Sequence, residues 1–189
     1  MKKILFLIAV ILIAVINIIL LKPYIDEYNE KQKYEFKLDT ADGPVKLEDF
    51  KGKAVAIFFG YTYCPDVCPT ALSMMADSLK KLSKEELDKF TGILISVDPD
   101  RDTLKNLKEY SQYFHPNFIG ATSSEENLLD ISKRYGAFYQ KVKLPNSEMD
   151  YSVSHTSYIY IFDKEGNLST QLKHFIKPSD ITKAIKKAL

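Results

Sequence analysis

The hydrophobic pattern of the chain begins with a continuous apolar segment near the N-terminus. Residues 4–21 are apolar apart from Asn17, and lysines flank them on both sides. These 18 residues are close to the lower limit for a helix that crosses a bilayer. The pattern therefore predicts a membrane anchor at residues 1–22, a polar tether at residues 23–33 and one domain at residues 34–189.

The charges around the apolar segment predict its orientation. Lys2 and Lys3, together with the amino terminus, outweigh the mixed charges that follow the segment, so the start of the chain is expected to stay cytoplasmic. The protein would then be a single-pass protein of the cell (inner) membrane, with its C-terminal domain on the periplasmic or extracytoplasmic side. A cleaved signal peptide is the alternative, but its apolar core is usually shorter, and residues 22–25 offer no small-residue cleavage site.

After the tether, short apolar runs alternate with amphipathic segments. Continuous apolar runs at residues 54–59 and 93–97 are typical of buried strands, and residues 34–38 and 45–47 alternate as in a β-hairpin. Amphipathic or capped segments predict helices that begin at Val67, after Ser83, near Leu104, near Ser124 and at Pro178, and strands are predicted at residues 158–162 and 168–172. Alternating helices and strands favour a three-layer α/β sandwich with an N-terminal β-hairpin.

The charge balance narrows the classes of partner. The chain has 26 basic and 25 acidic residues and a formal net charge of +1. This balance gives no field that would attract a polyanion, so we expect no nucleic-acid partner.

The two cysteines form the main candidate reactive site. Cys64 and Cys68 stand four apart and follow the predicted buried strand 54–59 directly. If a helix begins at Val67, the sulfurs lie at its positive N-terminal end, which lowers the pKa of a thiol. A structural disulfide is the alternative, but closing a loop of about five residues contributes only ~2 kcal/mol.

Two thiolates are also a soft pair of metal ligands that suits Cu(I), and an added imidazole makes such a site tolerant of Cu(II). Zinc is formally compatible with the same ligands and a water. Of the three histidines, His155 lies where a strand-end loop can face the mouth of a neighbouring strand, whereas His115 is typical of a loop and His174 of a strand surface.

Three ordered motifs resemble the Sco (SenC/PrrC) family of copper-binding proteins over nearly the whole C-terminal domain. Cys64–Pro69 matches the family's CPDVCP pattern, Ser96–Thr103 resembles its SVDPxRDT segment, and Ser154–Asp163 resembles its histidine-bearing strand. The resemblance implies a thioredoxin-like fold with an N-terminal membrane anchor. It further implies copper binding by Cys64, Cys68 and His155, and a role in assembling the CuA centre of cytochrome c oxidase.

The resemblance makes a membrane-tethered copper chaperone the favoured function, with an oxidase subunit, a copper donor and a thiol reductase as partners. Many members of the family have Asp where this chain has Ser154, and a missing carboxylate beside the imidazole predicts weaker copper binding. Asp98, Asp100 and Asp102 are interpreted as turn and cap residues with no metal role.

The alternative function is thiol-disulfide exchange on oxidase-subunit or other extracytoplasmic cysteines, with Cys64 and Cys68 as the redox pair. General reductases of the thioredoxin type have two residues between their cysteines and a proline in the facing loop. This chain has three residues between Cys64 and Cys68 and no proline from Tyr151 to Phe162.

Overall fold

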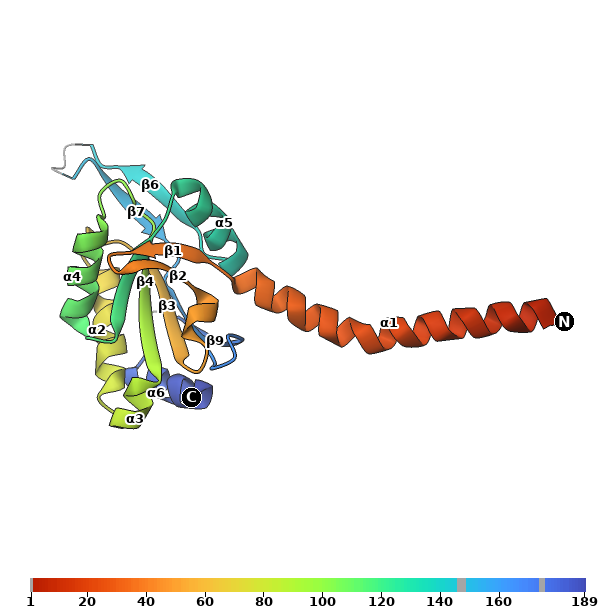
Figure 1. Cartoon of the computed structure of the whole chain (residues 1–189). Coiled ribbons are helices and arrows are strands. Elements are labelled where there is room, and N and C mark those ends of the chain that lie inside the picture. The colour runs from red at the N-terminus through yellow and green to blue at the C-terminus, as the bar shows by residue number, and fades with distance from the viewer. Residues whose placement is uncertain (1, 146–148, 174–175) are drawn as a thin grey trace. The chain divides into compact units, whose positions relative to one another are not determined.

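The N-terminal part of the chain is one long helix in the computed structural model, which describes residues 2–145, 149–173 and 176–189. Helix α1 covers Lys2–Tyr34 (Figure 1), and residues 1–33 and 34–189 form two separate units. The predicted tether at 23–33 thus forms part of this helix. Apart from Pro23, its charged and amide side chains are compatible with a helix.

The predicted membrane anchor is not supported by the structure. No helix within the described residues is both long and apolar enough to cross a membrane.

The second unit is built around a seven-stranded sheet with the order β2-β1-β5-β4-β3-β8-β9. Strand β3 lies inside this sheet, where it pairs in parallel with β4 and antiparallel with β8, so that Ile57 lies between Ile93 and Tyr160. Every residue of β3 and β4 is buried, as their continuous apolar sequence predicts. The strands are β1 (Lys37–Thr40), β2 (Gly43–Lys46), β3 (Ala54–Gly60), β4 (Phe90–Ser96), β5 (Phe118–Thr122), β8 (Tyr158–Phe162) and β9 (Leu168–Lys173).

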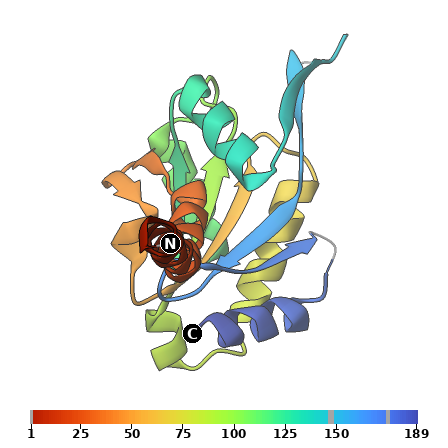
Figure 2. The same cartoon turned by 90° about the vertical axis from the view of Figure 1, so that its right-hand side faces the viewer.

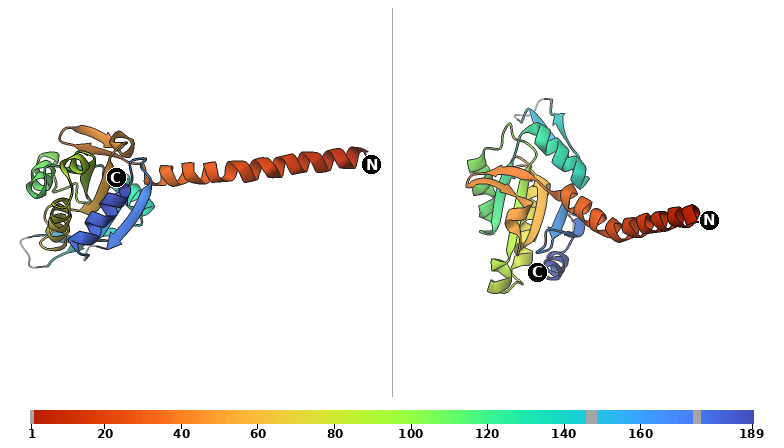
Figure 3. Two further views of the ribbon diagram at one scale, coloured as in Figure 1. Left: turned by 90° about the horizontal axis from the view of Figure 1, so that it is seen from below. Right: turned by 45° about the vertical axis from the view of Figure 1, so that its right-hand side comes forward.

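Helices cover both faces of this sheet (Figures 1 and 3). Helix α2 contacts both α4 and α6, and these helices lie on the face toward which Gly60 and Gly120 point. On the other face, Tyr135 of α5 packs its ring edge-on against Phe59 and Tyr160. The predicted three-layer α/β sandwich is therefore confirmed. The helices are η1 (Leu47–Phe50), α2 (Val67–Leu79), α3 (Lys84–Asp88), α4 (Leu104–Phe114), α5 (Glu125–Tyr135) and α6 (Pro178–Ala188).

Capping residues define several of these helix boundaries, as the sequence predicted. The Ser83 side chain accepts from the Glu86 N–H at the start of α3, and the Glu86 carboxylate accepts from the Ser83 N–H in return. Ser124 caps α5, which ends at Gly136, a residue with a left-handed backbone (φ +66°) that favours glycine.

One element was not predicted from the sequence. Strands β6 (Tyr139–Lys143) and β7 (Tyr151–His155) form a separate two-stranded antiparallel ribbon, in which Tyr139 pairs with His155. The ribbon projects from the end of the main sheet (Figure 2). His155 is thus the last residue of a strand and does not lie in the loop that the sequence predicted.

Candidate metal centre

The cysteines lie in a short loop between the central strand β3 and helix α2. The helix begins at Val67, as predicted, so Cys68 is in its first turn and Cys64 lies three residues before the helix. The Cys68 N–H donates to the Cys64 Sγ across 3.4 Å. Cys68 is fully buried, whereas Cys64 is half-buried, and both thiols are free.

Close packing at the end of β3 makes space for the buried sulfur. A Cβ atom built on Gly60 would lie 2.9 Å from the Cys68 Sγ and 3.0 Å from the Phe58 ring. The strand therefore requires the smallest residue at the position where the sulfur lies against it.

The two thiols have opposite acidities. The hydrogen bond from the Cys68 side chain lowers the pKa of the Cys64 thiol well below its usual range. Hydrogen bonds from the His155 ring and from the Cys68 and Asp66 N–H groups act in the same direction, and burial opposes them. The pKa of Cys68 is raised, because the neighbouring Cys64 thiolate and burial both disfavour a second negative charge. In the metal-free protein these opposite directions favour a thiolate at Cys64 over one at Cys68.

His155 reaches this pair from the ribbon. Its Nε2 lies 3.3 Å from the Cys68 Sγ, and its Nδ1 lies 3.2 Å from the Thr156 carbonyl oxygen. Because a carbonyl can only accept, Nδ1 donates to it, and this contact turns Nε2 toward the sulfurs. The edges of Phe58 and Tyr61 hold the ring, with centroids 6.0 and 5.9 Å away.

The predicted ligands come together in space. One ligand atom from each of Cys64, Cys68 and His155 lies within 4.8 Å of the other two. Within the described part of the chain, this is the one group of three or more histidine, cysteine or acidic side chains that is close enough to hold a metal ion. Two sulfurs and an imidazole nitrogen are a soft donor set that fits copper.

The other histidines do not join the centre. His115 follows the last residue of α4, and its Nδ1 accepts from the Asn117 N–H, which agrees with its predicted loop role. Burial lowers the pKa of His115. His174 lies outside the described residues.

Ser154 is exposed and next to His155 on the strand. Successive side chains of a strand point to opposite faces, so position 154 faces away from the imidazole. The Thr156 carbonyl already occupies the Nδ1 position at which a carboxylate would orient the ring.

The interpretation of the aspartates as turn and cap residues is only partly right. Asp98 begins the turn, since its carbonyl accepts from the N–H groups of Arg101 and Asp102, but helix α4 is capped by Thr103. Asp98 and Asp102 are instead buried acceptors for distant partners, whereas Asp100 forms an ion pair with Lys141. The cap assignment was wrong because the Thr103 side chain lies nearest to the first free N–H groups of the helix.

Two residues near the centre were not singled out from the sequence. Arg101 lies in the turn after β4, and Tyr151 begins β7, and the two side chains lie against each other. Arg101 belongs to the Ser96–Thr103 motif, so the sequence did contain a signal for it. Nothing in the local sequence marks Tyr151.

Comparison with known proteins places this geometry in a family. Residues 26–189 match the family model described as SCO1/SenC. A SCO2-like protein of Rickettsia conorii is 38% identical over 150 residues, which cover 79% of this chain and 71% of the relative.

Solved structures agree with the fold. The structure of Arabidopsis thaliana ScoI with copper bound has a TM-score of 0.75 and 31% identity, over 82% of this chain and 95% of that one. BsSco, described as a member of the Sco family of cytochrome c oxidase assembly proteins with a disulfide switch, has a TM-score of 0.63 and 29% identity, over 82% and 91% of the two chains. The predicted thioredoxin-like α/β fold is confirmed by these matches. The chain therefore belongs to the SCO1/SenC family.

Proposed function

We propose that this protein is a copper chaperone for the CuA centre of cytochrome c oxidase, and that it binds one copper ion through Cys64, Cys68 and His155. The observation that carries the proposal is the convergence of two sulfurs and one imidazole nitrogen within 4.8 Å. Support also comes from membership of a family in which relatives are described with copper bound and as oxidase assembly proteins.

The burial of the two sulfurs suits reversible delivery. Cys68 is enclosed, while Cys64 is partly open to solvent, so an incoming ligand can approach the metal from one side. Three protein ligands leave an open coordination position, whereas four closed ligands are typical of permanent structural sites. An oxidase-subunit thiolate or imidazole would enter there and take the copper by ligand exchange.

An anaerobic copper titration of the reduced protein tests the proposal. Wild type is expected to bind one copper ion, and Cu(II) binding is expected to give thiolate-to-copper charge-transfer absorption. Cys64→Ser should reduce that absorption, because one of two thiolates is lost. His155→Ala should weaken Cu(II) more than Cu(I), since the imidazole nitrogen is the harder of the donors.

His115→Ala is the matched control, because His115 is a partly buried histidine outside the site. Equal spectra and affinities for wild type and His155→Ala would remove His155 from the ligand set. Failure of the reduced wild type to bind copper would end the proposal.

Thiol-disulfide exchange is the second candidate function, and the opposite acidities of the two cysteines favour it. A partly exposed thiolate at Cys64 can attack a disulfide, and the buried Cys68 thiol can then resolve the mixed disulfide. Turnover of an insulin or oxidase-subunit disulfide by metal-free protein, with a thiol reductant supplied, would favour this function. Loss of that turnover on adding copper would show that the two functions use the same sulfurs.

The site of action is also part of the proposal. The apolar run at residues 4–21 is what supports an extracytoplasmic domain on a membrane tether, where a copper donor and a thiol reductase would act on it. Cell fractionation and protease protection of the C-terminal domain test this placement. Recovery of the full-length chain in the cytosolic fraction would contradict it.

A further inference from the structure

One turn of the chain touches both halves of the candidate centre. The turn runs from Asp98 to Asp102, between β4 and α4. On the cysteine side, the buried Asp102 carboxylate accepts from the Thr62 N–H at 3.0 Å and from the Thr62 hydroxyl at 2.5 Å. Thr62 lies two residues before Cys64, so Asp102 fixes the start of the cysteine loop.

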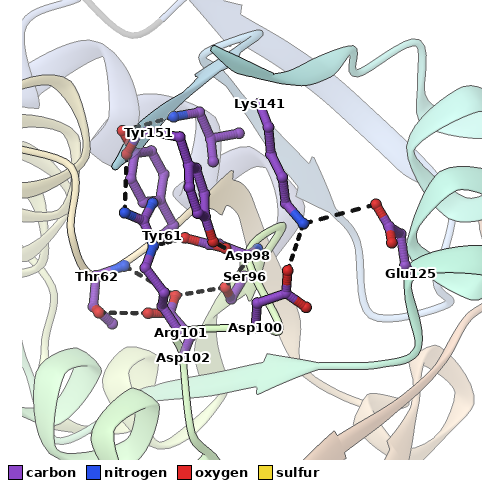
Figure 4. Close-up of polar contacts among 11 residues, drawn as sticks. Tyr61, Thr62, Ser96, Asp98, Asp100, Arg101, Asp102, Glu125, Lys141 and Tyr151 are labelled. Atoms are coloured by element: carbon purple, nitrogen blue, oxygen red, sulfur yellow. Dashed lines mark hydrogen bonds and ion pairs between the residues drawn. The ribbon is translucent and has the colours of Figure 1, made fainter. Parts of the chain in front are cut away.

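On the histidine side, Arg101 and Asp98 hold the first residue of β7 (Figure 4). Arg101 Nε donates to the Asp98 carboxylate at 2.6 Å, and its Nη1 donates to the Tyr151 carbonyl at 2.9 Å. The Tyr151 hydroxyl donates to the other Asp98 oxygen at 2.7 Å. These three residues therefore form a closed set of hydrogen bonds that joins the turn to the backbone and side chain of the ribbon.

Stacking adds to this set. The Arg101 guanidinium carbon lies 3.8 Å from the centroid of the Tyr151 ring and 4.9 Å from that of Tyr63, the neighbour of Cys64. Such distances permit cation–π attraction to both rings. The Asp98 side chain is fully buried and that of Arg101 is 18% exposed, so water competes little for these contacts.

Two further contacts join the ribbon to the rest of the domain, a hydrogen bond and an ion pair. The Val153 N–H donates to the hydroxyl of Tyr61, the residue that follows β3, which links β7 directly to the start of the cysteine loop. Lys141 of β6 pairs with Asp100 at 2.7 Å on the exposed side. An exposed pair of that kind contributes little, because water competes for both charges.

We propose that Arg101, acting with Asp98 and Tyr151, is a positioning residue that holds the His155 strand against the cysteines. Tyr151 and His155 are the two ends of β7, so fixing one end restricts the other. The inference rests on the proposed metal-binding role of His155. A planar guanidinium is required, because one lysine nitrogen cannot bond Asp98 and the Tyr151 carbonyl and stack at the same time.

The test compares three variants of the full chain. Arg101→Lys keeps the positive charge but loses the planar guanidinium with its two separate donors. Tyr151→Phe loses only the hydrogen bond from the hydroxyl to Asp98. Lys141→Met removes the ion pairs with Asp100 and Glu125 and a distant contact with the Tyr151 ring (5.6 Å). It leaves the hydrogen bonds among Arg101, Asp98 and Tyr151 in place, so it is the matched control. The expected order of effect is Arg101→Lys, then Tyr151→Phe, with Lys141→Met close to wild type.

The first measurement uses reduced, metal-free protein. Nuclear Overhauser effects between the His155 ring and the rings of Phe58 and Tyr61 report whether the imidazole keeps its place. They should weaken strongly in Arg101→Lys and remain in Lys141→Met. This measurement needs no copper, so it decides on Arg101 even if the copper-binding proposal fails.

The second measurement uses Cu(II)-loaded protein. Arg101→Lys should lower Cu(II) affinity by about 10- to 100-fold, the usual effect of removing a group that orients a ligand. It should also reduce the imidazole nitrogen coupling in the electron paramagnetic resonance spectrum toward that of His155→Ala, while thiolate charge-transfer absorption remains. General destabilisation would not separate the nitrogen signal from the sulfur signal.

Wild-type ring contacts in Arg101→Lys would overturn the inference, and so would equal losses in Arg101→Lys and Lys141→Met. If Arg101→Lys does not fold, Tyr151→Phe decides the question. Unchanged ring contacts in Tyr151→Phe would then overturn the inference.

Discussion

The cysteine loop and the histidine ribbon bring ligands to one place by different physical means. The cysteines are four residues apart, and the loop that carries them is fixed by the fully buried strand β3 and the first turn of α2. His155 lies 87 residues after Cys68, on a two-stranded ribbon outside the main sheet. The comparison teaches that core packing positions the sulfurs, whereas a few polar and stacking contacts position the imidazole.

The largest expected effect is on copper affinity, and it tests the cysteine loop, which the core positions. Cys68→Ser should lower Cu(I) affinity by far more than the roughly 100-fold upper range for losing a group that merely orients a ligand. The reason is that a hydroxyl is a poor ligand for a soft ion. Competition with a chromogenic Cu(I) chelator measures the affinity, and far-ultraviolet circular dichroism checks the fold. Affinity within tenfold of wild type would contradict the assignment of Cys68 as a ligand.

A second prediction asks whether core packing really positions the sulfur. Gly60→Ala places a methyl group 2.9 Å from the Cys68 Sγ, and overpacking of this kind costs about 1–3 kcal/mol of unfolding free energy. Because the displaced atom is a proposed ligand, copper affinity should also fall. Urea denaturation gives the first quantity and chelator competition the second.

Gly120→Ala is the matched control for this prediction. Its new methyl group would meet the Leu107 carbonyl oxygen, away from the metal centre. The control should lose stability while its copper spectrum stays that of wild type. If both variants change the spectrum equally, the packing at Gly60 is not specific to the sulfur.

The same comparison explains how much the sequence alone could predict. The central strands could be located because β3 and β4 are uninterrupted apolar runs, and α3 and α5 could be located from the caps Ser83 and Ser124. These signals are local. They were enough to place Cys64 and Cys68 at a strand end beside a helix N-terminus.

The ribbon could not be predicted in this way. In β6 no residue is buried, and in β7 only Val153 is. Residues 151–155 do alternate large side chains with small polar ones, but the run is only one strand long and its partner β6 has no regular alternation, so the pairing of the two strands carries no clear sequence signal. The roles of Asp98 and Asp102 also depend on partners far away in the sequence, Tyr151 and Thr62. Family resemblance selected His155, but only the structure shows what holds it.

A third prediction concerns the rates at which the two thiols are alkylated at different pH. Since the hydrogen bond from Cys68 lowers the pKa of Cys64, its thiolate persists as pH falls from about 8.5 to 6, where an unperturbed thiol with a pKa of about 8.5 loses most of its charge. Alkylation of Cys64 by iodoacetamide in reduced, metal-free protein should therefore change little over this range. Mass spectrometry of peptides also should show Cys68 reacting far more slowly, because it is buried and protonated.

Cys68→Ala provides the control, because it removes the hydrogen bond that does most to lower the pKa of Cys64. The alkylation rate of Cys64 in this variant should fall as pH falls. An equal slope in wild type and variant would show that the cysteine loop does not depend on the contact between the two thiols.

The smallest expected effect concerns position 154, where the histidine ribbon departs from the family pattern. The sequence predicted that Ser154 weakens copper binding, but its side chain is exposed and faces away from the imidazole, and the Thr156 carbonyl already lies 3.2 Å from Nδ1. Ser154→Asp should therefore change the unfolding free energy by no more than about 0.5 kcal/mol. It should also change Cu(II) affinity by less than about tenfold, the lower end of the usual effect of a group that orients a ligand.

Isothermal titration with Cu(II) provides the measurement. Ser152→Asp is the control, because position 152 lies on the same face of the strand as position 154. A gain of tenfold or more in Ser154→Asp alone would mean that the ribbon turns when it binds metal, so that its fixed position holds only for the metal-free protein.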